Sequence, residues 1–160
     1  MMTLVVGLWA MGCASGPVSL VGYKVPNRQQ VAIVIDISDQ VNQADQSGAV
    51  ATLADRFTDR LKEHGINSQV YSSKYDHPKP PRVDVFVSKW NGTPDVAHWG
   101  FALAAWNSIA VECKVTLPGQ SQPVFSRHFE HTSAASMGSE NDNAAAEGVA
   151  DEIVSAILKH

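Results

Sequence analysis

The feature that most constrains the fold is a change of hydrophobic period between residues 31 and 61. Residues 31–37 read Val-Ala-Ile-Val-Ile-Asp-Ile, which is apolar on both alternating faces, as in a β-strand covered on both sides. From Gly48 the apolar residues recur at the spacing of a helix, and His64-Gly65 is a typical helix end. The apolar stripe of this expected helix consists of Val50, Leu53, Ala54, Phe57 and Leu61.

The rest of the chain predicts four further strands and a second helix. Strands are expected at 66–72 and 82–90, where apolar and polar residues alternate. A long strand from about 104 to 117 and a returning strand at 124–132 flank a Pro-Gly loop that is typical of a hairpin. A final helix is expected from about 142 to 158, and its stripe consists of Ala146, Val149, Ala150, Ile153 and Ile157.

The predicted order of elements is therefore β-α-β-β-β-β-α. We expect an α/β protein, more closely an α+β sandwich, in which a mixed sheet of about five strands has two amphipathic helices packed on one face. The first strand–helix–strand unit should be parallel and the last three strands an antiparallel meander. With 160 residues in all, the chain suits a single folded domain, expected over residues 30–160.

The amino terminus has the character of a secretion signal. Residues 1–12 are apolar and uncharged, and the first charge of the chain is Lys24. The apolar run is too short for a transmembrane helix, which needs roughly 20 residues, but it matches the apolar region of about 7–15 residues in a signal peptide. The sequence therefore predicts a signal peptide over residues 1–12.

The signal is followed by Ala10-Met11-Gly12-Cys13, which resembles the lipobox of bacterial lipoproteins. The resemblance implies cleavage before Cys13 and attachment of a lipid to its thiol, so that acyl chains hold the protein on a membrane. Residues 13–29, rich in Gly, Pro and Ser, then suit a flexible tether. No Asp follows the cysteine, which by the same resemblance implies the outer membrane, with the domain facing the periplasm. The alternative is a buried first strand in which Cys13 is an ordinary core residue.

A second resemblance concerns the folded part of the chain. The element order, together with the aromatic phrase at 99–106 before a long strand and a Pro-Gly hairpin, is similar to a group of small proteobacterial envelope lipoproteins. More loosely, it is similar to the α/β domains of lipoproteins that assist envelope assembly, such as the activators of peptidoglycan synthases and the curli-secretion lipoprotein. This resemblance covers roughly residues 30–158, implies an accessory role and transfers no catalytic residue.

Charge and motif content narrow the possible functions. The chain has 16 acidic and 12 basic residues, a net charge of −4, which argues against a nucleic-acid partner because phosphate contacts need a basic face. No Gly-x-Ser-x-Gly elbow, Walker loop or Gly-x-Gly-x-x-Gly motif is present in the sequence. We therefore expect no catalytic activity and no cofactor.

A metal or acid–base site is the alternative hypothesis. Asp36 and Asp39 follow the first strand, at the edge where α/β sheets place ligands. His98, His128 and His131 are candidate metal ligands, but on a strand two residues three apart point to opposite faces. Solvated side chains are the plainer interpretation of all five, and the sequence predicts no metal site.

The tryptophans Trp90, Trp99 and Trp106 are the candidate partner-binding residues, because exposed tryptophans are strong anchors in interfaces. The alternative is that they close one end of the core. Cys113 has the phase of the apolar residues around it and is expected to be a small buried side chain without a disulfide partner.

Together these patterns predict a lipid-anchored periplasmic binding or accessory module of the cell envelope. Its expected contacts are the membrane, through the lipid on Cys13, and an envelope protein or a glycan. The alternative is a small envelope enzyme or metal-binding protein that uses Asp36 and Asp39 or the three histidines.

Overall fold

The computed structural model describes residues 18–39, 41, 43–72, 78–91, 106–134 and 144–158. Within these ranges the helices are α1 (Gln43–Glu63) and α2 (Ala144–Leu158). The strands are β1 (Ser19–Leu20), β2 (Tyr23–Lys24), β3 (Val31–Ile37), β4 (Ser68–Ser72), β5 (Arg82–Asn91), β6 (Trp106–Thr116) and β7 (Phe125–Ala134).

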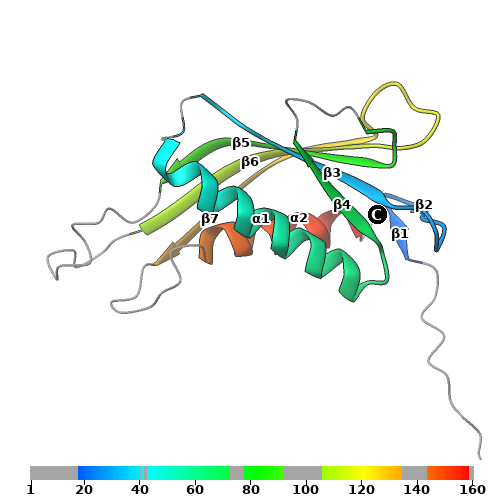
Figure 1. Cartoon of the computed structure of the whole chain (residues 1–160), viewed down its shortest axis with the longest axis horizontal. Coiled ribbons are helices and arrows are strands. Elements are labelled where there is room, and N and C mark those ends of the chain that lie inside the picture. Colours follow the sequence, from blue (N-terminus) through cyan, green and yellow to red (C-terminus); the bar gives the residue numbers. More distant parts are fainter. Residues whose placement is uncertain are drawn as a thin grey trace, which may run out of the picture.

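The main sheet has five strands in the order β4-β3-β5-β6-β7. Strand β3 is parallel to both of its neighbours, whereas β5, β6 and β7 form an antiparallel meander. Helix α1 connects β3 to β4, because parallel neighbours need a crossover and cannot be joined by a tight turn. Both helices lie on the same face of the sheet (Figure 1). The α+β class, the mixed sheet and the order of its elements are therefore confirmed.

The core lies between the helices and the sheet. Alternate residues of the three central strands point into it, and the apolar stripes of both helices cover them, as the periodicity predicted. In α1 the side chains of Leu53, Phe57 and Leu61 are completely buried. The fully buried residues of α2 are Ala145, Ala146, Val149, Ala150, Ile153 and Ile157.

The start of the described chain differs from the expected tether. Strands β1 and β2 form a small antiparallel hairpin, and Leu20 in it is 0% exposed. The backbone N–H of Val21 donates to the carbonyl oxygen of Ile157 at 2.7 Å, which fixes the hairpin to the end of α2. The folded domain thus includes residues 18–29, because their apolar side chains cover the core; residues 1–17, with Cys13, lie outside the described residues.

Some element boundaries also differ, and β4 begins at Ser68 and not at the expected residue 66. Helix α1 starts at Gln43, five residues before the expected start at Gly48, because residues 43–47 are polar except for Ala44 and include no large apolar residue that would mark the period. Strand β7 continues to Ala134, where it pairs with Trp106. No helix among the described residues combines the length and the apolar character that crossing a membrane requires.

Candidate functional site

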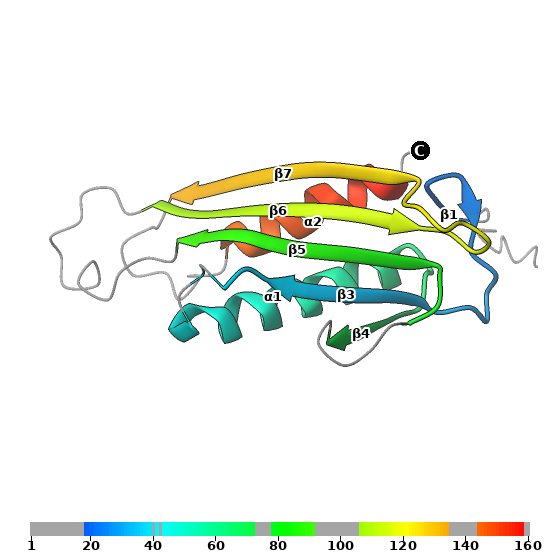
Figure 2. The same ribbon diagram turned by 90° about the horizontal axis from the view of Figure 1, so that it is seen from above.

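The candidate site is the face of the sheet that the helices leave uncovered, which Figure 2 views directly. Because side chains alternate along a strand, every second residue of each strand reaches this open face. Register places Asp36, Phe86, Glu112 and His128 side by side on β3, β5, β6 and β7. This cross-strand row therefore sets an aromatic ring between two carboxylates.

A shallow hollow of about 390 Å³ lies on the open face around this row. Phe86 is 38% exposed, an unusually high value for a phenylalanine in a central strand. The exposed Asp36 carboxylate accepts a hydrogen bond from the N–H of Ile37 at 2.9 Å. The residues that line the hollow are Val34, Asp36, Asp84, Val85, Phe86, Glu112 and Lys114.

Most of the other charges on the open face are paired along or across the strands. Arg82 Nε lies 2.9 Å from Asp84 Oδ2, and Lys114 Nζ lies 3.8 Å from Glu112 Oε2. Lys89 and Glu130 reach towards each other from opposite sides of Ala110 at 3.8 Å. Such solvent-exposed pairs contribute little to stability, so they can exchange for contacts with another molecule. The face is suited to binding a polar, charged surface.

The two predicted carboxylates do not form a pair. Asp36 lies on the open face near the end of β3, and Asp39 is exposed in the segment that follows. The described residues contain no group of three His, Cys, Asp or Glu side chains that could hold a metal ion. In the described part of the chain, the open face thus offers carboxylates for contacts but no cluster of ligands for a metal ion.

The two candidate histidines on β7, His128 and His131, point to opposite faces, as their spacing on a strand predicted. His128 is exposed on the open face, opposite Glu112. His131 lies on the helix side, and its Nδ1 is 2.8 Å from Oε1 of Glu152 in α2. His98 lies outside the described residues. A metal ion cannot be shared by His128 and His131, because the sheet separates their rings.

Trp90 corrects part of the tryptophan hypothesis. It is 8% exposed and belongs to the hydrophobic core, so it does not present a surface anchor. The cause is a shift of register between Val87 and Lys89, after which Trp90 takes the inward position that simple alternation assigns to Lys89. Trp99 and the side chain of Trp106 lie outside the described residues.

Cys113 is completely buried on β6, as its phase predicted. Burial, with a smaller contribution from the negative charge of Asp84, raises the pKa of its thiol to about 12. A thiol with such a pKa is neutral at physiological pH and does not act as a nucleophile. Cys113 is therefore a packing residue.

On the helix side, a charged cluster joins the two helices. Two guanidinium nitrogens of Arg56, Nε and Nη2, donate hydrogen bonds to the carboxylate of Asp151, at 2.8 and 2.7 Å. Arg60 Nε lies 3.0 Å from the same carboxylate. The hydrogen bond from Arg56 is the main cause that lowers the pKa of Asp151. This cluster positions α1 against α2 and lies on the face opposite the hollow.

Sequence reasoning did not select Phe86 as a site residue. Its signal was present, because Phe86 alternates with the inward valines Val83, Val85 and Val87 and shares the phase of Asp84. An aromatic residue at a polar phase of a strand indicates an exposed ring. Both helices were expected on one face of the sheet, so the exposed position of this ring on the other face was within reach of the sequence.

The fold is shared with solved bacterial structures. PelC from Paraburkholderia phytofirmans, solved as a dodecamer, matches with a TM-score of 0.55 and 12% identity over 84% of this chain and 90% of that chain. A single-residue variant of the same dodecamer matches with a TM-score of 0.54 and 14% identity, over 91% and 93%. Protein XCC0632 from Xanthomonas campestris, of family DUF330, matches with a TM-score of 0.52 and 12% identity, over 92% and 86%.

No family model and no curated protein matches the chain. At identities of 12–14% the structural likeness establishes the fold alone. What the site can bind therefore depends on the residues of this chain.

Proposed function

We propose that the protein is a lipid-anchored accessory module of the bacterial cell envelope that binds a partner through the open face of its sheet. It is held on the outer membrane by acyl chains on Cys13, after cleavage of residues 1–12, and faces the periplasm. Its partner is an envelope protein or a glycan. It performs no catalysis.

The observation that carries the anchoring is the position of Cys13 relative to the domain. The cysteine ends an apolar, uncharged segment and is directly preceded by the small residue Gly12, as in a lipobox. Leu20, only seven residues later, is a fully buried core residue. Cys13 therefore stands directly in front of the folded body, which is where a membrane anchor has to be placed.

The open face supports the binding role. A central-strand phenylalanine that keeps 38% of its surface exposed, beside Asp36 and Glu112, is a favourable contact for a cationic or amphipathic group. It is surrounded mostly by charged side chains in an open hollow, and not by the walls of an enclosed pocket. PelC, which has the same fold, is a dodecamer. Surfaces of this fold are thus capable of supporting assembly.

The anchoring is tested on protein extracted from membranes. Cys13 and Cys113 are the two cysteines of the chain, and Cys113 is buried. We expect an intact mass that corresponds to residues 13–160 plus acyl chains, no thiol that reacts with maleimide in the native protein, and one that reacts after denaturation. An uncleaved chain with two reactive thiols in the denatured protein would refute the anchor.

The binding face is tested by site-specific photocrosslinking in cells. A photoreactive residue replaces Phe86 on the open face, and the matched control replaces Asp55, which is exposed on α1 on the other side of the molecule. We expect a discrete crosslinked species from position 86 and none from position 55. Crosslinks of equal yield from both positions, or none from position 86, would show that the open face is not the binding surface.

A further inference from the structure

One end of the domain collects segments that are far apart in the sequence. Strands β3, β4 and β5 all begin there, because they are parallel, and both helices end there (Figure 2). The β1–β2 hairpin packs on the same end, where Asn67 Nδ2 also donates to the carbonyl oxygen of Asn27 at 3.5 Å. We call this the anchor end; it comprises residues 18–30, 62–67, 78–82 and 117–124.

The anchor end has an excess of positive charge. Its residues include five cations and a single carboxylate, Glu63, although the whole chain has a net charge of −4. Glu63 forms an ion pair with Arg60, and Arg82 is paired with Asp84. The remaining four cations are exposed and form no ion pair with another residue in the described part of the chain: Lys24, Arg28, Lys62 and Lys79.

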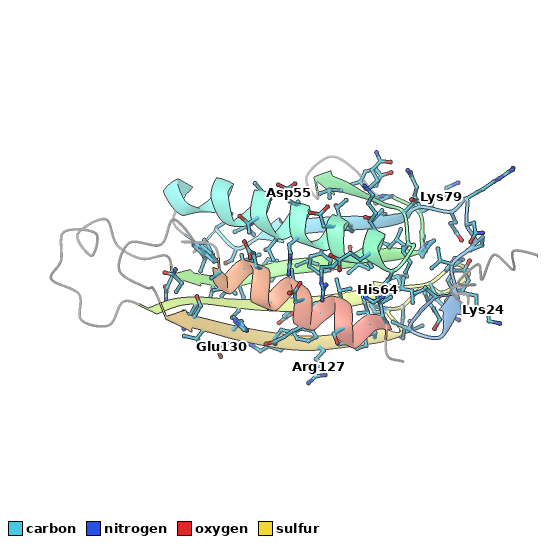
Figure 3. The ribbon with its side chains drawn as sticks, turned by 90° about the horizontal axis from the view of Figure 1, so that it is seen from below. Lys24, Asp55, His64, Lys79, Arg127 and Glu130 are labelled. Carbon is cyan, nitrogen blue, oxygen red and sulfur yellow. The ribbon has the colours of Figure 1, made fainter. Side chains whose placement is uncertain are left out.

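These cations face outward at one extremity of the molecule. Figure 3 shows Lys24 and Lys79 at the same end as His64, which follows α1, whereas Glu130 lies towards the other end. Lys62 is two residues before His64, and Arg28 lies between β2 and β3. The four cations come from three separate segments, so the fold, and not one basic run in the sequence, brings them together.

The same end is where the chain departs towards Cys13. Val18 is the first described residue, and five residues of chain bridge a distance of at most about 18 Å. If Cys13 is acylated, as the proposed function holds, this end is kept close to the phospholipid headgroups. The tether is short enough for charges on this end to come within the Debye length of roughly 8 Å over which a negatively charged membrane surface attracts them.

We infer that Lys24, Arg28, Lys62 and Lys79 form a surface that docks on anionic phospholipid headgroups. The inference deepens the proposed function, because the anchor supplies the proximity. Docking at this end directs the opposite end of the molecule's long axis away from the bilayer (Figure 1). The open face is then presented beside the membrane, accessible to a partner.

The test uses a chain of residues 13–160 with Cys13→Ser, which cannot be acylated. The described residues that form the core or pack against it all lie at position 18 or later, so this chain keeps all the packing described. Binding is measured by cosedimentation with vesicles of phosphatidylcholine mixed with phosphatidylglycerol, and with vesicles of phosphatidylcholine alone. The quadruple variant K24Q/R28Q/K62Q/K79Q is compared with the control K89Q/K114Q, which removes two cations from the open face.

We expect binding to the mixed vesicles only, weakened by added salt. A Lys or Arg close to an anionic surface changes the partition constant by about fivefold, so the quadruple variant should bind at least about tenfold more weakly. The control should stay within about twofold of the parent chain. Far-UV circular dichroism of each variant establishes that it is folded.

Three outcomes would overturn the inference: equal binding of the quadruple variant, equal binding to uncharged vesicles, or capture by a soluble polyanion such as heparin without any vesicle binding. The result does not depend on acylation, because the tested chain has none. An unacylated Cys13 in the cell would refute the anchor while leaving the vesicle result readable. Conversely, if Cys13 is acylated but vesicle binding does not depend on the four cations, only the docking surface is refuted.

Discussion

Gly148 in α2 is the position where the structure reverses the ordinary effect of a substitution. In an exposed helix, replacing glycine by alanine stabilises a protein by about 1 kcal/mol, because glycine is the poorer helix former. Here a Cβ on residue 148 would meet the ring of His131, lying 2.6 Å from its Cδ2 and 2.7 Å from its Cε1. Real Cβ atoms do not approach neighbours so closely, so either the ring or the helix has to move.

Both movements have a cost. If the ring swings out, the contact between His131 Nδ1 and Glu152 Oε1 is lost, together with the packing of a side chain that is only 30% exposed. That contact is a partly exposed pair and contributes at most about 1 kcal/mol. If the helix shifts instead, the packing of its buried stripe against the sheet loosens, which typically costs about 1–3 kcal/mol. Set against the gain in helix propensity, Gly148→Ala should destabilise the protein by about 1 kcal/mol.

The decisive measurement is a double-mutant cycle. With His131→Ala in place the obstacle is gone, and the same Gly148→Ala change should stabilise by about 1 kcal/mol, giving a coupling of about 2 kcal/mol between the two positions. Urea unfolding of the four proteins, followed by tryptophan fluorescence, measures these free energies. Stabilisation of the same size in both backgrounds would show that the ring does not oppose a Cβ, and the reasoning would fail.

Three further predictions follow from the packing. Leu20→Ala should lower the free energy of unfolding by about 2–5 kcal/mol in a urea titration, as for a core leucine, whereas a Leu20 in a free tether would have no effect. Asp151→Asn should destabilise the protein by up to about 1 kcal/mol at neutral pH, because Arg56 lowers the pKa of Asp151 and the carboxylate stabilises the fold above its ordinary pKa near 4. The difference in stability between the parent protein and the variant should vanish as the pH falls below that value. A difference that persists in acid contradicts this role. Cys113 should resist maleimide at pH 8 in the native state and react at once in denaturant, and fast native labelling would contradict its burial.

The secondary structure was largely readable from periodicity. The helical stripes that include Leu53 and Ile153, and the alternation that places Cys113 inward, are properties of a few neighbouring residues, and burial on one side of an element is what selects them. The short hairpin at 19–24 was not predicted, because strands of two residues have no measurable period. The sequence did not decide between core and surface for Trp90, because a bulge is defined by the partner strand and not by the strand itself.

The candidate sites show the same division. Asp36 was singled out from its place after a strand, but its neighbours Phe86 and Glu112 come from strands 50 and 76 residues further on and meet it only through register. The prediction that His128 and His131 point to opposite faces of the sheet is confirmed, because two positions on one strand are related by local geometry alone.

Local chemistry in the chain determined where most strands and helices form, which side chains turn inward along a regular element, and that an apolar, uncharged segment precedes Cys13. Each of these properties depends on residues that are close together in the sequence, within one or two helical turns or one strand. Tertiary structure alone decided the strand order, the row of side chains that register forms on the uncovered face, and the meeting of Lys24, Arg28, Lys62 and Lys79 at one end. Those features depend on pairings between distant segments, and one sequence does not encode them in any local pattern because many pairings satisfy the same periodicities.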